Sequence, residues 1–80
     1  MKDNTKRTFP EIWAALDRRT RREIYERALI EIHCADVTFR NWAHGRRVPK
    51  AYPTAKALAS ILAEVAGISV NPEELFPNIL

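Results

Sequence analysis

The chain contains little cysteine, little glycine and no long apolar run. Its 80 residues include one cysteine, Cys34, so no disulfide can form within the chain. A zinc centre is not expected, because structural zinc takes four ligands and His33, Cys34 and His44 supply three. No stretch approaches the roughly 18 apolar residues that span a bilayer, and the polar segment 1–9 lacks the apolar core of a signal peptide.

These absences place the chain among soluble proteins. A lone thiol fits a reducing compartment, so we expect a cytoplasmic protein with no metal and no cofactor. The composition, 46% hydrophobic and 29% charged, favours one small packed domain over disorder. We expect residues 1–80 to form that domain, with residues 1–7 as a flexible N-terminus.

The positive charge is concentrated in the first part of the chain. The net charge is +3, but residues 1–50 carry 12 basic and 7 acidic groups, whereas residues 51–80 carry 1 basic and 3 acidic groups. A basic surface on so small a domain favours a polyanionic partner.

Capping patterns divide the chain into helices. Thr8-Phe9-Pro10-Glu11 has the cap, early proline and third-position glutamate of a helix start, which predicts a helix over 9–17. Thr20-Arg21-Arg22-Glu23 repeats the capping-box pattern and predicts a second start at Thr20, with Glu23 and Arg27 paired on its outer face. The apolar face of this second helix is expected to comprise Tyr25, Ala28, Leu29 and Ile32.

Three further helices are expected. Segment 36–44 precedes Gly45 and segment 53–66 precedes Gly67, both in the position of a left-handed helix end. The sequence Asn71-Pro72-Glu73-Glu74 predicts the last helix start. No segment alternates as a strand would, so the fold class is an all-α, compact five-helix bundle. The apolar stripe of segment 53–66 is expected to be Ala55, Leu58, Ala59, Leu62 and Ala66.

The second and third helices are too closely linked to lie side by side. Only residues 33–35 separate them, so they must cross steeply, as in a helix-turn-helix at about residues 20–44. Phe39 and Trp42 are three residues apart and are expected to face the core. The outer side then carries Arg40 and Asn41, side chains that can read base edges in the DNA major groove.

The segment Thr38–Pro49 resembles the recognition helix and following loop of phage Cro and repressor-like (XRE-type) helix-turn-helix DNA-binding domains. The likeness covers residues 20–77 and includes the closing Glu73-Glu74-Leu75-Phe76. It implies a lambda-repressor-like fold, sequence-specific double-stranded DNA binding and a role as a small transcriptional regulator. By position, the implied base-reading residues are Asp36, Val37, Thr38, Arg40 and Asn41. The implied backbone-binding residues are Arg46, Arg47, Lys50 and Tyr52.

The dense run of arginines before the second helix is either a solvated surface or a second backbone contact, in which case Arg21 and Arg22 bind phosphate. The chain also differs from the family pattern. The recognition helix has Ala35 where the family has a small hydroxyl cap, so the cap is expected to pass to Asp36. His33 stands in place of the turn glycine.

The sequence also bears on functions other than DNA binding. An enzyme is not expected, because the neighbouring side chains of His33 and Cys34 diverge in a tight turn. Cys34 is expected to be a packing residue. One alternative is a protein-interaction module, which docks a partner through Leu75, Phe76, Ile79 and Leu80. Another is non-specific nucleic-acid or RNA binding by the arginines. A DNA-binding form is expected to be a homodimer, since one recognition helix reads only about four or five base pairs. Ile79 and Leu80, with the residues around Pro77, are the candidate dimer contacts.

Overall fold

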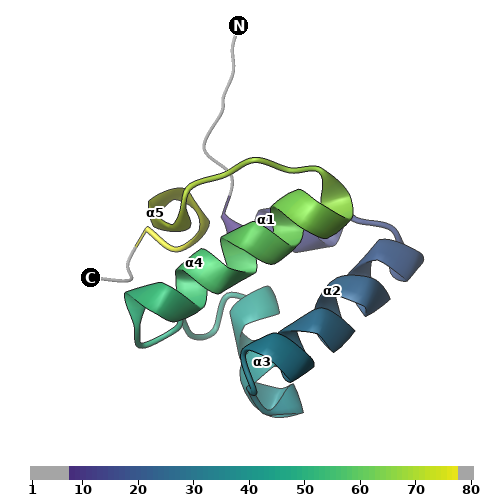
Figure 1. The fold of residues 1–80 in the computed structure, drawn as a ribbon. Coiled ribbons are helices and arrows are strands. Elements are labelled where there is room, and N and C mark those ends of the chain that lie inside the picture. The colour runs from purple at the N-terminus through teal and green to yellow at the C-terminus, as the bar shows by residue number, and fades with distance from the viewer. Residues whose placement is uncertain (1–7, 78–80) are drawn as a thin grey trace, which may run out of the picture.

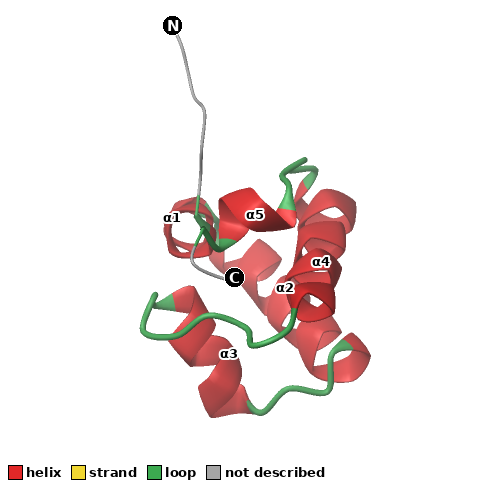
Figure 2. Cartoon of the chain, turned by 90° about the vertical axis from the view of Figure 1, so that its left-hand side faces the viewer, coloured by secondary structure: helices red, strands yellow, loops and turns green. Residues whose placement is uncertain are grey.

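The computed structural model describes residues 8–77, in which α-helices pack around one core (Figures 1 and 2). The elements are α1 (Phe9–Ala15), α2 (Arg18–Glu31), α3 (Asp36–Ala43), α4 (Tyr52–Ile61), the π-helical η1 (Leu62–Ala66) and α5 (Pro72–Leu75). No strand occurs in the described part of the chain, and the expected five-helix all-α bundle is confirmed. The expectations for residues 1–7, Ile79 and Leu80 lie outside the described residues.

The bundle has two ends. In both views α1 and α5 lie at the upper end, while α3 lies at the lower end (Figures 1 and 2). α2 packs against α4 and η1 between the two ends, and α3 packs against α1 and α2. One side of α3 therefore faces the core and the other faces solvent.

Helix ends follow local capping chemistry. α1 and α5 both begin with the predicted capping boxes, at Thr8 and Asn71. The predicted start of α2 at Thr20 is wrong. Asp17 is the N-cap residue instead, and its carboxylate accepts a hydrogen bond from the Thr20 hydroxyl in the first turn. Asp and Thr are both favoured at the N-cap position, and the helix begins at the earlier of the two.

The fourth predicted helix, over residues 53–66, changes its winding. α4 begins at Tyr52 and ends at Ile61, and the last five residues of the predicted helix, Leu62–Ala66, form the wider π-helical turn η1. Gly67 then ends the element in the left-handed conformation, with φ of 69°. The predicted stripe is buried except for Ala66, which is partly buried, and Ile61 joins it in the core.

The core is built around Phe39 of α3. Its ring is packed edge-on against Phe9, Trp13 and Tyr25, with centroid distances of 5.8, 5.2 and 5.4 Å. Edge-to-face pairs add to the hydrophobic stabilisation of the buried rings. Phe39 is 1% exposed and Trp42 is 6% exposed, which confirms their predicted core positions.

Two of the four residues of the expected C-terminal docking surface lie within the described part of the chain. Leu75 and Phe76 are both buried in the core, where Phe76 lies 5.7 Å from the Phe9 ring. Neither side chain can meet a partner without opening the bundle. The interaction-module hypothesis is therefore wrong for these two residues.

The turn between α2 and α3 depends on His33. This residue has a φ of +62°, in the left-handed region that favours glycine. An L-residue with a β-carbon pays about 1–2 kcal/mol for that conformation. A left-handed residue allows the chain to turn sharply within the few residues between α2 and α3.

His33→Gly is expected to be more stable than His33→Ala by about 1 kcal/mol, because glycine adopts positive φ without steric cost. Urea unfolding of the two variants measures the difference. Both substitutions remove the exposed imidazole, so its surface interactions cancel in the comparison. Equal stabilities would contradict a left-handed residue at this position.

Candidate nucleic-acid interface

The outer face of α3 is centred on Val37. Successive residues of a helix are about 100° apart, so Val37 points directly away from the midpoint between Phe39 and Trp42. Its side chain is 64% exposed. Arg40 and Asn41 lie on either side of Val37; the Arg40 side chain is 66% exposed and Asn41 is half-buried. These three expected base-reading residues share one solvent-facing surface.

The loop after α3 is fixed against the rest of the domain. The backbone N–H groups of Arg46 and Arg47 donate to the carbonyl of Asn41, at 2.9 and 3.3 Å. Gly45 has a φ of +77°, and a β-carbon there would lie 3.2 Å from Cγ of Pro10. Pro49 is buried. The loop thus folds back over the end of α3 and packs against α1.

A groove lies between α3, this loop and the start of α4. Among the residues that line it are Thr38, Asn41, Trp42, Arg47, Lys50 and Thr54. The side chains of Arg46, Arg47 and Lys50 are exposed, and none of them forms an ion pair with a described acidic residue. Their charge is therefore available to an external anion.

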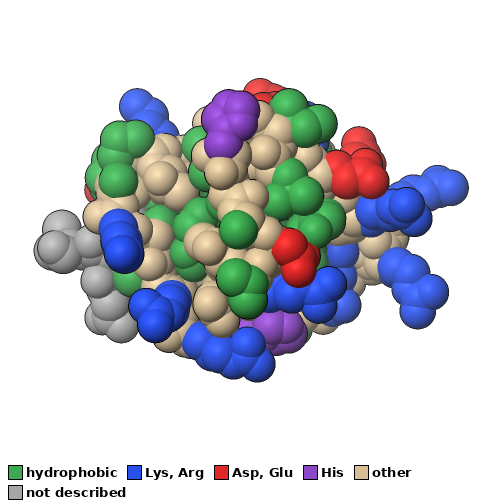
Figure 3. Space-filling model, turned by 90° about the horizontal axis from the view of Figure 1, so that it is seen from below, with side chains coloured by type: hydrophobic (Ala, Val, Ile, Leu, Met, Phe, Trp, Pro, Cys, Tyr) green, Lys and Arg blue, Asp and Glu red, His purple; other side chains and the backbone are tan. Residues whose placement is uncertain are grey.

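A second group of basic side chains lies on the other side of α3. Arg18 and Arg22 line a hollow together with Arg40, between α1, α2 and α3. Arg22 is 80% exposed and contacts Glu26 only at 3.4 Å. Figure 3 shows the molecule from below: Lys and Arg side chains lie at the left, along the lower edge and at the right of this face, and an acidic side chain lies among the hydrophobic and uncharged atoms between them.

Arg21 does not share this exposure. Its Nε donates to the carbonyl of Trp13 at 2.9 Å, and its Nη2 donates to the carbonyl of Ala14 at 3.0 Å. The guanidinium also lies over the Trp13 ring, 5.7 Å from the centroid. These contacts satisfy the end of α1, where backbone carbonyls lack helical partners. A phosphate contact by Arg21 stays a prediction, but much of its guanidinium is already used within the fold.

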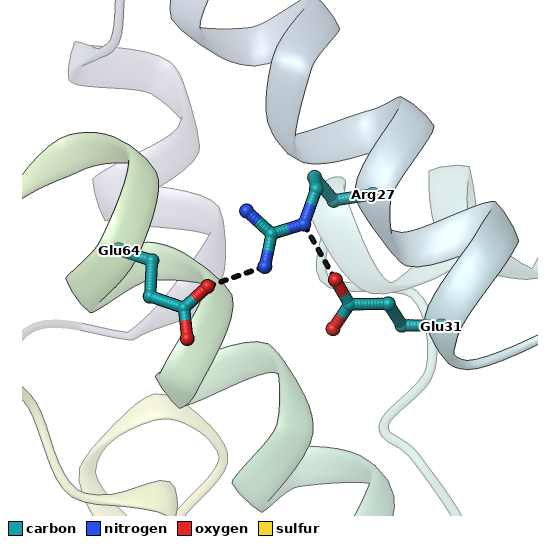
Figure 4. Close-up of polar contacts among 3 residues, drawn as sticks. All are labelled: Arg27, Glu31 and Glu64. Atoms are coloured by element: carbon teal, nitrogen blue, oxygen red, sulfur yellow. Dashed lines mark hydrogen bonds and ion pairs between the residues drawn. The ribbon is translucent and has the colours of Figure 1, made fainter.

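Arg27 joins two elements away from α3. Its Nε donates to Glu31 at 2.5 Å, and its Nη2 donates to Glu64 of η1 (Figure 4). The hydrogen bond to Glu64, followed in size of effect by the one to Glu31, raises the pKa of Arg27 above its ordinary value. The predicted pairing with Glu23 is thus replaced by partners on α2 and η1. Arg27 contributes no free charge to the candidate interface.

Asp36 and Tyr25 form a polar contact at the start of α3. The Tyr25 hydroxyl donates to Oδ1 of Asp36 at 2.6 Å, and Nε of Arg40 donates to the same oxygen at 3.0 Å. Asp36 is the first helical residue and Ala35 is the N-cap, so the expectation that the cap passes to Asp36 is wrong. The hydrogen bond from Tyr25, followed in size of effect by the one from Arg40, lowers the pKa of Asp36.

Tyr25 was expected only in the apolar face of α2. A tyrosine on a buried face needs a partner for its hydroxyl, which is the signal that a polar group lies nearby.

The expected backbone contact Tyr52 is exposed on α4, and its hydroxyl lies 3.4 Å from Oε2 of Glu73.

Cys34 lies half-buried beside the turn. Its Sγ lies 3.9 Å from the carbonyl oxygen of Ala28, and burial raises the pKa of the thiol. A raised pKa disfavours the reactive thiolate.

Among residues 8–77, no three His, Cys, Asp or Glu side chains gather as metal ligands would, and no helix is long and apolar enough to cross a membrane.

Arg21→Ala is expected to destabilise the domain by about 1–2 kcal/mol, because it removes two carbonyl contacts and the stacking on Trp13. Arg22→Ala is the matched control and is expected to change stability by less than about 0.5 kcal/mol, since its ion pair is exposed. Thermal and urea unfolding of both variants checks the difference. Equal losses would show that Arg21 does not hold α1.

Comparison of the chain with protein-family models, with curated proteins and with solved structures found no match in any of the three. Function is therefore inferred from the arrangement of side chains around α3.

Proposed function

We propose that this chain binds double-stranded DNA sequence-specifically, with α3 as the recognition helix, and acts as a small transcriptional regulator. The observation that carries the proposal is the surface of α3. Its outward side chains lie between two groups of basic residues, one on the loop after α3 and one at the start of α2. A helix entering the major groove meets base edges in the middle and phosphates on both sides.

The outward residues of α3 have suitable chemistry for base edges. Val37 offers an apolar contact for the methyl group of thymine, and Asn41 can bond adenine through two atoms. A major groove about 12 Å wide accepts a helix of this diameter. The expected reader Thr38 is half-buried in the groove beside Asn41, closer to the loop than to the centre of the face.

The basic residues would hold the duplex without reading it. Arg46, Arg47 and Lys50 lie on the side of Asn41, whereas Arg18 and Arg22 lie on the side of Arg40. Phosphate contacts of this kind set the position of a protein on DNA and make binding depend on salt. RNA is a poorer partner for such a surface, because the major groove of an A-form helix is too narrow to admit side chains.

The variants Asn41→Ala and Arg47→Ala distinguish base recognition by α3 from phosphate binding by the loop. Asn41→Ala is expected to cost about 1–3 kcal/mol on the preferred site and much less on random duplex, because it removes a base contact. Arg47→Ala is expected to weaken binding to both duplexes similarly and to lower the salt slope by about one unit. Equilibrium binding to both duplexes at two salt concentrations measures each effect.

Arg47 is a better test of phosphate contact than Arg46. Nη1 of Arg46 lies 3.5 Å from Oδ1 of Asn41, so its removal also changes the surroundings of the reading residue. Equal losses on both duplexes for Asn41→Ala would exclude base reading by that residue. An unchanged affinity after replacing Arg47 and Lys50 together would contradict DNA binding by the loop.

We further propose that the DNA-bound form is a homodimer. A helix of eight residues reaches only about four or five base pairs, too few for a distinctive site. Two copies on a palindrome double the length of sequence that is read. Sedimentation of the protein with its selected duplex is expected to give two chains per duplex. One chain per duplex, with no pairing in the free protein, would contradict the dimer.

A further inference from the structure

One carboxylate oxygen links the core of the domain to the surface of α3. Oδ1 of Asp36 accepts both the Tyr25 hydroxyl, at 2.6 Å, and Nε of Arg40, at 3.0 Å. The Tyr25 ring is packed edge-on against buried Phe39, at 5.4 Å. The hydroxyl is therefore held by the core, and the carboxylate is held by the hydroxyl.

This contact uses one end of the Arg40 side chain and leaves the other end open. Nε is bonded to Asp36, but neither terminal NH₂ group has a hydrogen-bond partner among residues 8–77. The side chain nevertheless remains largely exposed to solvent on the outer face of α3. Holding a long side chain before binding reduces the conformational entropy that binding would otherwise cost.

We infer that Tyr25 and Asp36 are positioning residues that hold Arg40 so that its terminal NH₂ groups read one guanine in the major groove. Guanine presents two acceptors there, O6 and N7, which match the paired donors of a guanidinium. Adenine presents a donor in place of O6 and is therefore discriminated against. The inference rests on the proposed function and names the base that this side of α3 selects.

The pairing also accounts for an acidic residue on a surface that meets DNA. A lone carboxylate on α3 would repel phosphate, whereas the Asp36–Arg40 pair is neutral as a unit. Replacing Asp36 by Asn therefore has two opposite effects. Loss of negative charge strengthens binding to any duplex, and loss of the ion pair loosens Arg40 and weakens the preference for guanine. A purely structural role of Asp36 would not produce this combination.

The experiment uses the full chain and the duplex that it selects from a pool randomised over roughly 20 base pairs, enough for two half-sites. Each guanine of that duplex is replaced in turn by 7-deazaguanine, which lacks the N7 acceptor. The measured quantity is the ratio of Kd values for substituted and unmodified duplex. Both values come from the same protein preparation, so a partly unfolded variant does not change the ratio.

The wild-type chain is expected to lose roughly tenfold or more in affinity at one guanine of each half-site. In Arg40→Ala that ratio is expected to fall to about one. Tyr25→Phe keeps the aromatic ring and leaves the charge of Asp36 unchanged, but it removes the hydroxyl that bonds Asp36. The ratio for this variant is expected to fall to roughly two or three. Asp36→Asn should lower the ratio similarly and bind random duplex more tightly. Ser60→Ala removes an exposed hydroxyl on α4 at a residue that lines neither the groove nor the hollow beside α3, and it should leave the ratio unchanged.

Three results would overturn the inference. The wild-type chain could show no guanine that is sensitive to 7-deazaguanine, or Arg40→Ala could keep the sensitivity, and either result would exclude Arg40 as the reader. A full wild-type ratio in both Tyr25→Phe and Asp36→Asn would exclude positioning. A pool that yields no selected duplex would instead overturn the proposed function, and this inference with it.

Discussion

Phe39 is the contact on which the arrangement of α3 depends. Its buried ring meets Phe9 and Trp13 of α1 and Tyr25 of α2, so one side chain fixes α3 to two other helices at once. Since residues of a helix follow one another at about 100°, fixing the direction of Phe39 also fixes the direction of every other side chain on α3. The outward directions of Val37 and Arg40 from the helix axis are therefore a consequence of aromatic packing in the core.

The arginines divide into those that stabilise the domain and those whose charge is left free. Arg21 closes the end of α1 and Arg27 connects α2 to η1, so both substitute for part of the core that a chain of this size cannot build. The arginines on either side of α3 have no strong acidic partner among the described residues, and their mutual repulsion opposes folding. A surface that carries such charge without internal compensation is suited to an external polyanion, which would relieve the repulsion.

Local signals in the sequence were sufficient for most of the helix ends but not for the contacts between helices. The capping boxes of α1 and α5 and the left-handed glycines at 45 and 67 are decided by a few neighbouring residues, and these predictions were confirmed. The start of α2 was wrong because Asp17 and Thr20 both have capping chemistry, and only the chain path from α1 selects between them. The contact of Tyr25 with Asp36 could not be predicted, because it depends on how α2 and α3 cross. The same holds for the use of Arg21 by α1.

Both ends of α3 are fixed to other parts of the domain. At its start, Asp36 is bonded to Tyr25 of α2, and at its end the carbonyl of Asn41 accepts the N–H groups of the basic loop. That loop in turn packs against α1 where Gly45 meets Pro10. The residues proposed to read bases and the basic loop after α3 are therefore joined by hydrogen bonds and packing in one unit. Contact of the loop with one phosphate would set the depth and register of α3 in the groove. Binding would then cost little further conformational entropy, because these side chains and the loop are already ordered. Rigidity of this kind favours discrimination between sequences, because a side chain held in place cannot move to accommodate a wrong base.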